Sequence, residues 1–266
     1  MRIGVDPGNK EIKVAAANGA IAFNSCLGEW RERKLTSSFS ENDMEIEWRG
    51  KRYFLGDLAE NESRFKLQAN GISKVHDEGV LRVLIALYQF ESDVFDITVS
   101  QPIKGHTDRL KEKFKAMLLG NHELIVNGRR KEFYIENVGV SAEGAVAYFT
   151  TEKEYLTRII DIGSGTINGA TIKNGKFIDL ESFTIQGGMN DGDPALIADV
   201  IHSKLKGLWS EDDSMHLIGG GAESVSKHLN FPGSFVHYPF ENEPKFANAI
   251  GLYLLGELLH ERGKRG

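Results

Sequence analysis

The chain has 266 residues, of which 41% are hydrophobic, a formal net charge of −6 and one cysteine. That length can bury a substantial core and suits two small lobes better than one. The lone Cys26 excludes an internal disulfide, and no apolar run reaches the 18 residues that a membrane helix needs. The acidic balance argues against sequence-independent binding of nucleic acid. We therefore expect a cytoplasmic protein with no membrane anchor and no direct contact with nucleic acid.

Residues 3–23 begin with an apolar run that ends in Asp6, and a turn of small residues follows at Gly8 and Asn9. A second apolar-rich run is closed by Asn18-Gly19, and Asn-Gly is the strongest short signal for a hairpin. The segment therefore predicts a three-stranded meander.

Residues 27–75 are polar and read as an insertion with a hairpin at 45–57. Apolar spacing then predicts a helix at 80–88 and a buried strand at 94–100. A loop and a helix should occupy 101–120, and a hairpin should turn at Asn127-Gly128.

Ser141 is expected to cap a helix over 141–151 that connects the two lobes. Glu143 would then lie in its first turn. There it could complement the helix dipole, or it could point into a cleft and orient water on a γ-phosphate. Position in the sequence does not choose between these roles.

Residues 159–178 repeat the pattern of the first meander. An apolar run ends in Asp161, and a second run is closed by Asn174-Gly175. The glycine turn between them consists of Gly163, Ser164 and Gly165. An Asp-x-Gly string alone is usually a turn with an Asx cap, but two copies in register favour a shared cleft. Glycine turns let backbone N–H groups reach phosphate oxygens, and the two aspartates would hold Mg²⁺ through its waters.

Two other glycine-loop folds can be excluded. The alternating, β-branched run after Gly165 predicts a strand where a dinucleotide-binding loop requires a helix. The chain also contains no GxxxxGK[ST] string, so it has no P-loop.

Near the C-terminus, an apolar strand ends in a triple glycine before a helix that should start near Ala222, with Glu223 just inside it. The glycines could let adenine or ribose lie against the backbone, or they could form a plain tight turn. They are Gly219, Gly220 and Gly221. The last segment should be a long amphipathic helix packed between lobes, because its apolar residues recur at helical spacing. These residues are Phe246, Ile250, Leu254 and Leu258.

The order of DPGNK, VSAEGAVA, DIGSGT, LIGGGAE and FANAIGLY resembles the five nucleotide-binding motifs of the superfamily of actin, heat-shock chaperones and sugar kinases. QPIKGH followed by a basic helix, LLGNHELIVNG and FANAIGLYLLG are similar to ParM-like bacterial actins. Between Asp161 and Gly219 there is room for hairpins, the GGMNDGD loop and one helix at 194–208. The chain therefore resembles the reduced AlfA-type members that lack subdomain IIB.

The resemblance implies an α/β, actin-like ATPase fold of two related lobes, each with a mixed sheet flanked by helices, and a nucleotide cleft between them. Domain I would span 1–138, with 27–75 as subdomain IB. Domain II would span 139–266, and its C-terminal helix at about 243–261 would pack back on domain I.

The resemblance also implies roles for individual residues. Asp6 and Asp161 would bracket Mg²⁺ through water, and Glu143 would position the attacking water. ATP or GTP would be held at its phosphates by Gly8, Asn9 and Lys10 with Gly163, Ser164, Gly165 and Thr166. Its nucleoside would lie on Gly219, Gly220, Gly221 and Glu223.

By the same resemblance, the ATP-bound protein would polymerise with itself. The filament would move a plasmid through a DNA-binding adaptor protein bound to a centromere-like site. Two alternatives stay open: a small-molecule kinase of the same fold, and a nucleotide-binding scaffold that does not hydrolyse its ligand.

Overall fold

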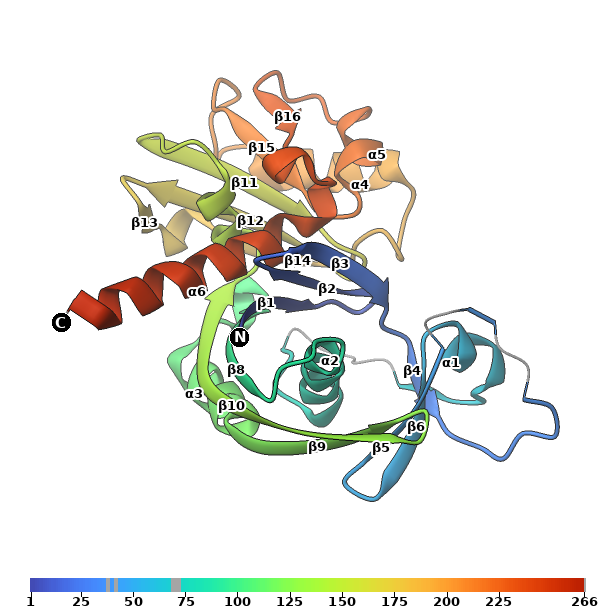
Figure 1. Ribbon diagram of the computed structural model, residues 1–266. Helices are drawn as coiled ribbons and strands as arrows, with labels where there is room; N and C mark the ends of the chain where they lie inside the picture. The colour runs from blue at the N-terminus through green and yellow to red at the C-terminus, as the bar shows by residue number, and fades with distance from the viewer. Residues whose placement is uncertain (37–38, 41–42, 68–72, 266) are drawn as a thin grey trace.

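The computed structural model describes residues 1–36, 39–40, 43–67 and 73–265. Parts of the predicted insertion, at 37–38, 41–42 and 68–72, lie outside the described residues. Within that part of the chain, two sheets form two layers, and the long C-terminal helix lies between them (Figure 1).

The first sheet has the strand order β3-β2-β1-β8-β10-β9-β5-β6-β4-β7. Its strands are β1 (Arg2–Pro7), β2 (Glu11–Ala16), β3 (Gly19–Asn24), β4 (Leu27–Glu29), β5 (Met44–Trp48), β6 (Lys51–Leu55), β7 (Lys66–Leu67), β8 (Val94–Gln101), β9 (Gly120–Val126) and β10 (Arg129–Ala142). The helices of this half are α1 (Asp57–Glu62), α2 (Asp77–Tyr88), the 3-10 turn η1 (Ile103–Gly105) and α3 (Asp108–Leu118). Every residue of α2 from Gly79 to Leu87 is buried, since the helix lies on the concave side of this curved sheet (Figure 1).

The second sheet has the order β13-β12-β11-β15-β16, with β14 also paired to β12. Its strands are β11 (Leu156–Ile162), β12 (Thr166–Lys173), β13 (Lys176–Phe177), β14 (Phe183–Gln186), β15 (Met215–Ile218) and β16 (Ser234–Val236). The helical elements are η2 (Ala145–Thr150), η3 (Asp179–Glu181), α4 (Pro194–Leu205), α5 (Ala222–Ser226), η4 (Pro239–Glu241), η5 (Pro244–Phe246) and α6 (Ala247–Arg265).

Both predicted meanders are present, as β1-β2-β3 and β11-β12-β13. The predicted Asn-Gly turns form because asparagine and glycine tolerate positive φ better than other residues. At Asn127-Gly128 the φ angles are 49° and 78°, and at Asn174-Gly175 they are 50° and 70°. Between Asp161 and Gly219 the chain forms only β12, β13, η3, β14, α4 and β15, so subdomain IIB is missing. The proposed division into domains at 138/139 stays a prediction.

The prediction that Ser141 caps a helix is wrong. Ser141 belongs to β10, where it pairs with Ser100 of the parallel strand β8, and the Glu143 N–H extends the pairing to Gln101 O at 2.7 Å. The chain then turns at Gly144, whose φ is 74°, into the short 3-10 helix η2. Glu143 therefore follows a strand and precedes the helix, and it is not in a helical first turn.

Helix α6 packs directly on β1 at Gly4. A Cβ added at Gly4 would lie 2.4 Å from both Ala249 O and Tyr253 N, so only glycine allows this approach. The predicted helix begins later than expected: Phe246 lies in η5, and α6 begins at Ala247. Within α6, Ile250 packs against Ala15 of β2.

We expect Gly4→Ala to lower the free energy of unfolding by at least about 2 kcal/mol, since the added methyl group must displace helix backbone. Urea unfolding followed by circular dichroism measures the change. Gly263→Ala, in the same helix with no atom within 4 Å of the added Cβ, is the matched control and should stay within about 1 kcal/mol. Equal stability of the two variants would contradict the packing argument.

Candidate nucleotide site

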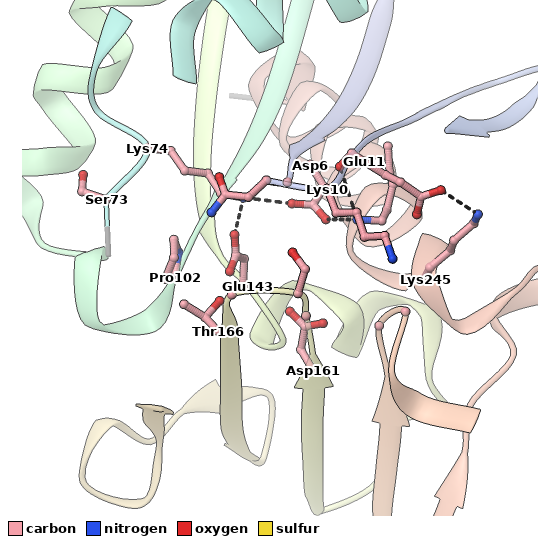
Figure 2. A pocket seen from close by; sticks show the side chains of 18 of the residues that line it. Asp6, Lys10, Glu11, Ser73, Lys74, Pro102, Glu143, Asp161, Thr166 and Lys245 are labelled. Carbon is pink, nitrogen blue, oxygen red and sulfur yellow. Dashed lines mark hydrogen bonds and ion pairs between the residues drawn. The ribbon is translucent and has the colours of Figure 1, made fainter. Parts of the chain in front are cut away.

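A pocket lies where the two sheets meet, and both repeated turns line it (Figure 2). Twelve of the residues predicted from the sequence are on its wall: Asp6, Gly8, Asn9, Lys10, Glu143, Asp161, Gly163, Ser164, Gly165, Thr166, Gly219 and Gly220. The wall also includes residues that the sequence reasoning missed: Glu11, Lys13, Ser73, Lys74, His76, Pro102 and Lys245.

The β1–β2 turn and the β11–β12 turn face each other across this pocket. The Asn9 side-chain amide comes within 3.7 Å of where a Cβ on Gly165 would lie. Each turn needs a glycine after its aspartate strand, because a Cβ would lie 2.6 Å from Glu11 O at Gly8 and 2.9 Å from Thr166 O at Gly163. The two repeated sequence segments therefore place their glycine turns on opposite sides of one pocket.

The segment 187–191 braces the second turn from behind. The N–H groups of Gly187, Met189 and Asn190 donate to the carbonyl groups of Gly165, Gly163 and Ser164 at 3.1, 3.1 and 2.9 Å. Because these carbonyl oxygens are held from behind, the turn keeps its shape at the pocket wall.

Asp6 is buried and already neutralised by lysines. Lys74 Nζ lies 3.0 Å from its Oδ1, Lys13 Nζ lies 3.6 Å from its Oδ2, and Ser100 Oγ donates to Oδ1 at 2.7 Å. Burial alone would raise the pKa of Asp6, but the two ammonium groups and the hydrogen bonds outweigh it and hold that pKa well below its ordinary value. Asp6 is therefore a charged carboxylate.

Asp161 is in the opposite situation. Its Oδ2 accepts a hydrogen bond from Asn248 Nδ2 at 2.9 Å, and the Gly219 backbone lies against its Oδ1. Burial, followed by the negative charges of Glu143 and Asp6, raises the pKa of Asp161 to about 7. Positive charge added beside Asp161 would therefore be favourable.

Glu143 joins the two sheets. Its Oε1 pairs with the Lys74 ammonium, and its Oε2 accepts from Asn168 Nδ2 of β12 at 3.0 Å. Figure 2 shows Lys74 between Asp6 and Glu143, with Asp161 on the other side of the pocket. Burial lowers the pKa of Lys74, but Asp6 and Glu143 reverse that effect and raise it above the ordinary lysine value. Lys74 therefore stays protonated and contributes a positive charge to the pocket wall.

Two predicted site residues do not reach the wall. A Cβ at Gly221 would lie 2.5 Å from Ile162 Cγ2, so this glycine faces the interior of the second half. Glu223 instead accepts a hydrogen bond from Tyr238 Oη at 2.7 Å. The α5 helix turns away from the cleft after Gly220 because the Gly221 N–H is tied to Ile162 O at 3.0 Å.

Among the described residues, no three His, Cys, Asp or Glu side chains are grouped so that they could hold a metal ion by themselves. No helix in the same part of the chain is both long enough and apolar enough to cross a membrane.

This fold, with a cleft between two related halves, defines the class of the protein. Residues 4–145, just over half of the chain, match the family model described as "Actin like proteins N terminal domain". The chain belongs to this family of actin-like proteins.

Solved structures of low sequence identity share the fold over nearly the whole chain. A filament of AlfA bound to AMPPNP has a TM-score of 0.84 at 23% identity, covering 98% of both chains. The filament of AlfA from B. subtilis plasmid pLS32 has a TM-score of 0.81 at 24% identity, covering 95% of this chain and 98% of the other. Ta0583, an archaeal actin homolog solved with ADP, has a TM-score of 0.76 at 17% identity, covering 97% and 99%. No curated protein sequence matches the chain.

Proposed function

We propose that this chain is an ATP- or GTP-hydrolysing protein whose nucleotide drives its assembly into filaments. We further propose that these filaments move plasmid DNA through a DNA-binding adaptor protein at a centromere-like site. The observation that carries the proposal is the opposition of the β1–β2 and β11–β12 turns across one pocket that also contains three buried carboxylates. The AlfA neighbours are filaments, and one of them binds AMPPNP, which supports the self-assembly and the ligand class.

The two turns would bind the phosphates through backbone N–H groups, with Lys10 and Lys13 adding charge. Glu143 would orient the attacking water and accept its proton. The nucleoside would lie toward Gly219 and Gly220, which are on the wall, and not toward Gly221 and Glu223.

Mg²⁺ fits this pocket at Asp161. Burial, followed by the negative charges of Glu143 and Asp6, raises the pKa of that carboxyl, and a hydrated cation on the phosphates would offset those charges. Asp6 could accept a metal-bound water as well at Oδ2, where Lys13 Nζ lies 3.6 Å away. When bound, the metal would neutralise phosphate charge that develops during hydrolysis.

The experiment is sedimentation of the purified protein with Mg²⁺ and ATP, GTP or ADP, followed by electron microscopy of the pellet. We expect filaments with a triphosphate and little pellet with ADP. A protein that stays monomeric at high concentration with both triphosphates would overturn the assembly proposal.

One observation favours the scaffold alternative. Both oxygens of Glu143 already bind protein groups in this structure, since Oε1 pairs with Lys74 and Oε2 accepts from Asn168. Phosphate release during assembly separates the two functions: filaments that form without releasing phosphate would support a scaffold.

A further inference from the structure

The Lys74 ammonium binds three oxygens, and a phosphate oxygen could replace one of them. This group can donate three hydrogen bonds, and three oxygens surround it. Asp6 Oδ1 lies at 3.0 Å, Ser100 Oγ lies at 3.2 Å, and Glu143 Oε1 is the third. Two of these oxygens belong to the first sheet, and only Glu143 belongs to the connection that leads to the second.

The backbone of Lys74 is held firmly while its side chain is long. A Cβ on Gly79 would lie 2.0 Å from Lys74 O, so the first turn of α2 packs directly against this residue. The Ser73 hydroxyl accepts from the Val75 N–H at 3.2 Å on the other side. A four-carbon stem on a fixed backbone lets the ammonium exchange one partner without moving the fold.

Glu143 and a phosphate in this pocket would compete for the same ammonium. Lys74 lies on the wall of the pocket, together with the β1–β2 and β11–β12 turns that would bind the phosphates. A phosphate oxygen could take the place of Glu143 Oε1 while the Asp6 and Ser100 contacts persist. Glu143 would then keep Asn168 and have one oxygen available for water.

We propose that Lys74 is a positioning residue shared between Glu143 and the terminal phosphate of a bound nucleoside triphosphate. This inference rests on the proposed nucleotide binding. Glu143 restrains Lys74 and so weakens triphosphate binding, and the phosphate, by drawing Lys74 away, releases Glu143 to orient water. A diphosphate has no γ-phosphate and leaves the Lys74–Glu143 pair in place.

The test is isothermal titration calorimetry with Mg²⁺ and AMPPNP or ADP on the native protein, Glu143→Gln, Lys74→Gln and the double variant. We expect Glu143→Gln to tighten AMPPNP binding about fivefold, because Lys74 is no longer held by a charge-assisted pair. Lys74→Gln should weaken AMPPNP binding about tenfold. ADP affinity should change less than about twofold in both single variants.

The double variant decides whether the gain passes through Lys74. In the Lys74→Gln background, Glu143→Gln should change AMPPNP affinity less than about twofold. The double variant also removes the charges of Lys74 and Glu143 together. This protects folding, because Lys74→Gln alone leaves the buried carboxylates of Asp6 and Glu143 without the ammonium between them. Lys245→Gln, on the same wall and paired with Glu11 at 3.1 Å, is the control and should change AMPPNP and ADP affinities alike.

Two results would overturn the shared lysine: no gain in AMPPNP affinity for Glu143→Gln, or an equal gain with Lys74 removed. If the native protein binds ADP and AMPPNP while the coupling is absent, only this inference fails. If the native protein binds neither, nucleotide binding itself fails, and the shared lysine with it.

Discussion

We expect the rate of phosphate release from ATP to fall about 100-fold or more when Glu143 is changed to glutamine. Glutamine has nearly the same shape and can still accept from Asn168, but it cannot take a proton from the attacking water. Removing a positioned general base typically costs a factor of 10² to 10⁴. The same change should tighten binding of the triphosphate, so the loss should appear in the chemical step.

Single-turnover release of phosphate at saturating Mg·ATP measures that step without interference from affinity. Glu257→Gln is the matched control. Glu257 is on α6, pairs with Arg2 of β1 at 2.8 Å, and does not line the pocket. The rate of this variant should equal that of the native protein. A Glu143→Gln rate within about threefold of the native rate would remove Glu143 from the chemistry.

Short sequence patterns predicted many of the strands, turns and helices of the fold. The Asn-Gly pairs at 127–128 and 174–175 fix hairpins because their backbone geometry needs positive φ at both positions. The run 80–88 has the spacing of a helix and is buried along α2. The two meanders could be found because each repeats the same strand, glycine turn and Asn-Gly pattern.

The connection at 141–151 could not be predicted in the same way. Its composition suits a helix, but pairing with β8 decides the conformation of Ser141 and Ala142. That pairing joins residues about 40 positions apart, and no local pattern encodes it. Tertiary pairing overrode local propensity, and Glu143 was carried to the end of a strand.

The site shows the same division between local and long-range information. Asp6, Asp161 and the glycine turns belong to a repeated motif and were found. Lys74 was missed because it is a single lysine near the end of the polar insertion at 27–75, and only the fold brings it to Asp6. Asn248 was missed too, although it bridges Asp161 and the Gly144 N–H, because the apolar pattern of α6 concealed one inward-facing amide.

Asp6→Asn should lower the free energy of unfolding of the ligand-free protein by about 3–5 kcal/mol. Asparagine keeps the shape and can accept from Ser100, but it leaves the buried Lys74 and Lys13 without their shared counter-charge. Chemical denaturation at pH 7 measures the change. Because the pKa of Asp6 is depressed on folding, its contribution is fully present above the unfolded value near 4 and is lost as the pH falls through the lower folded value. The difference between native protein and variant should therefore shrink in acid.

The matched control is Glu11→Gln, which breaks the Glu11–Lys245 pair on the rim of the same pocket. That pair has a similar N–O distance, 3.1 Å against 3.0 Å for Asp6–Lys74, but its side chains are 32% and 22% exposed, against 8% and 12%. Water screens the rim pair, so its loss should cost less than about 1 kcal/mol. Equal effects of the two changes would mean that burial does not set the strength of the Asp6 cluster. In that case, the positive charges of Lys74 and Lys13 would not explain how the Asp6 carboxylate can be buried.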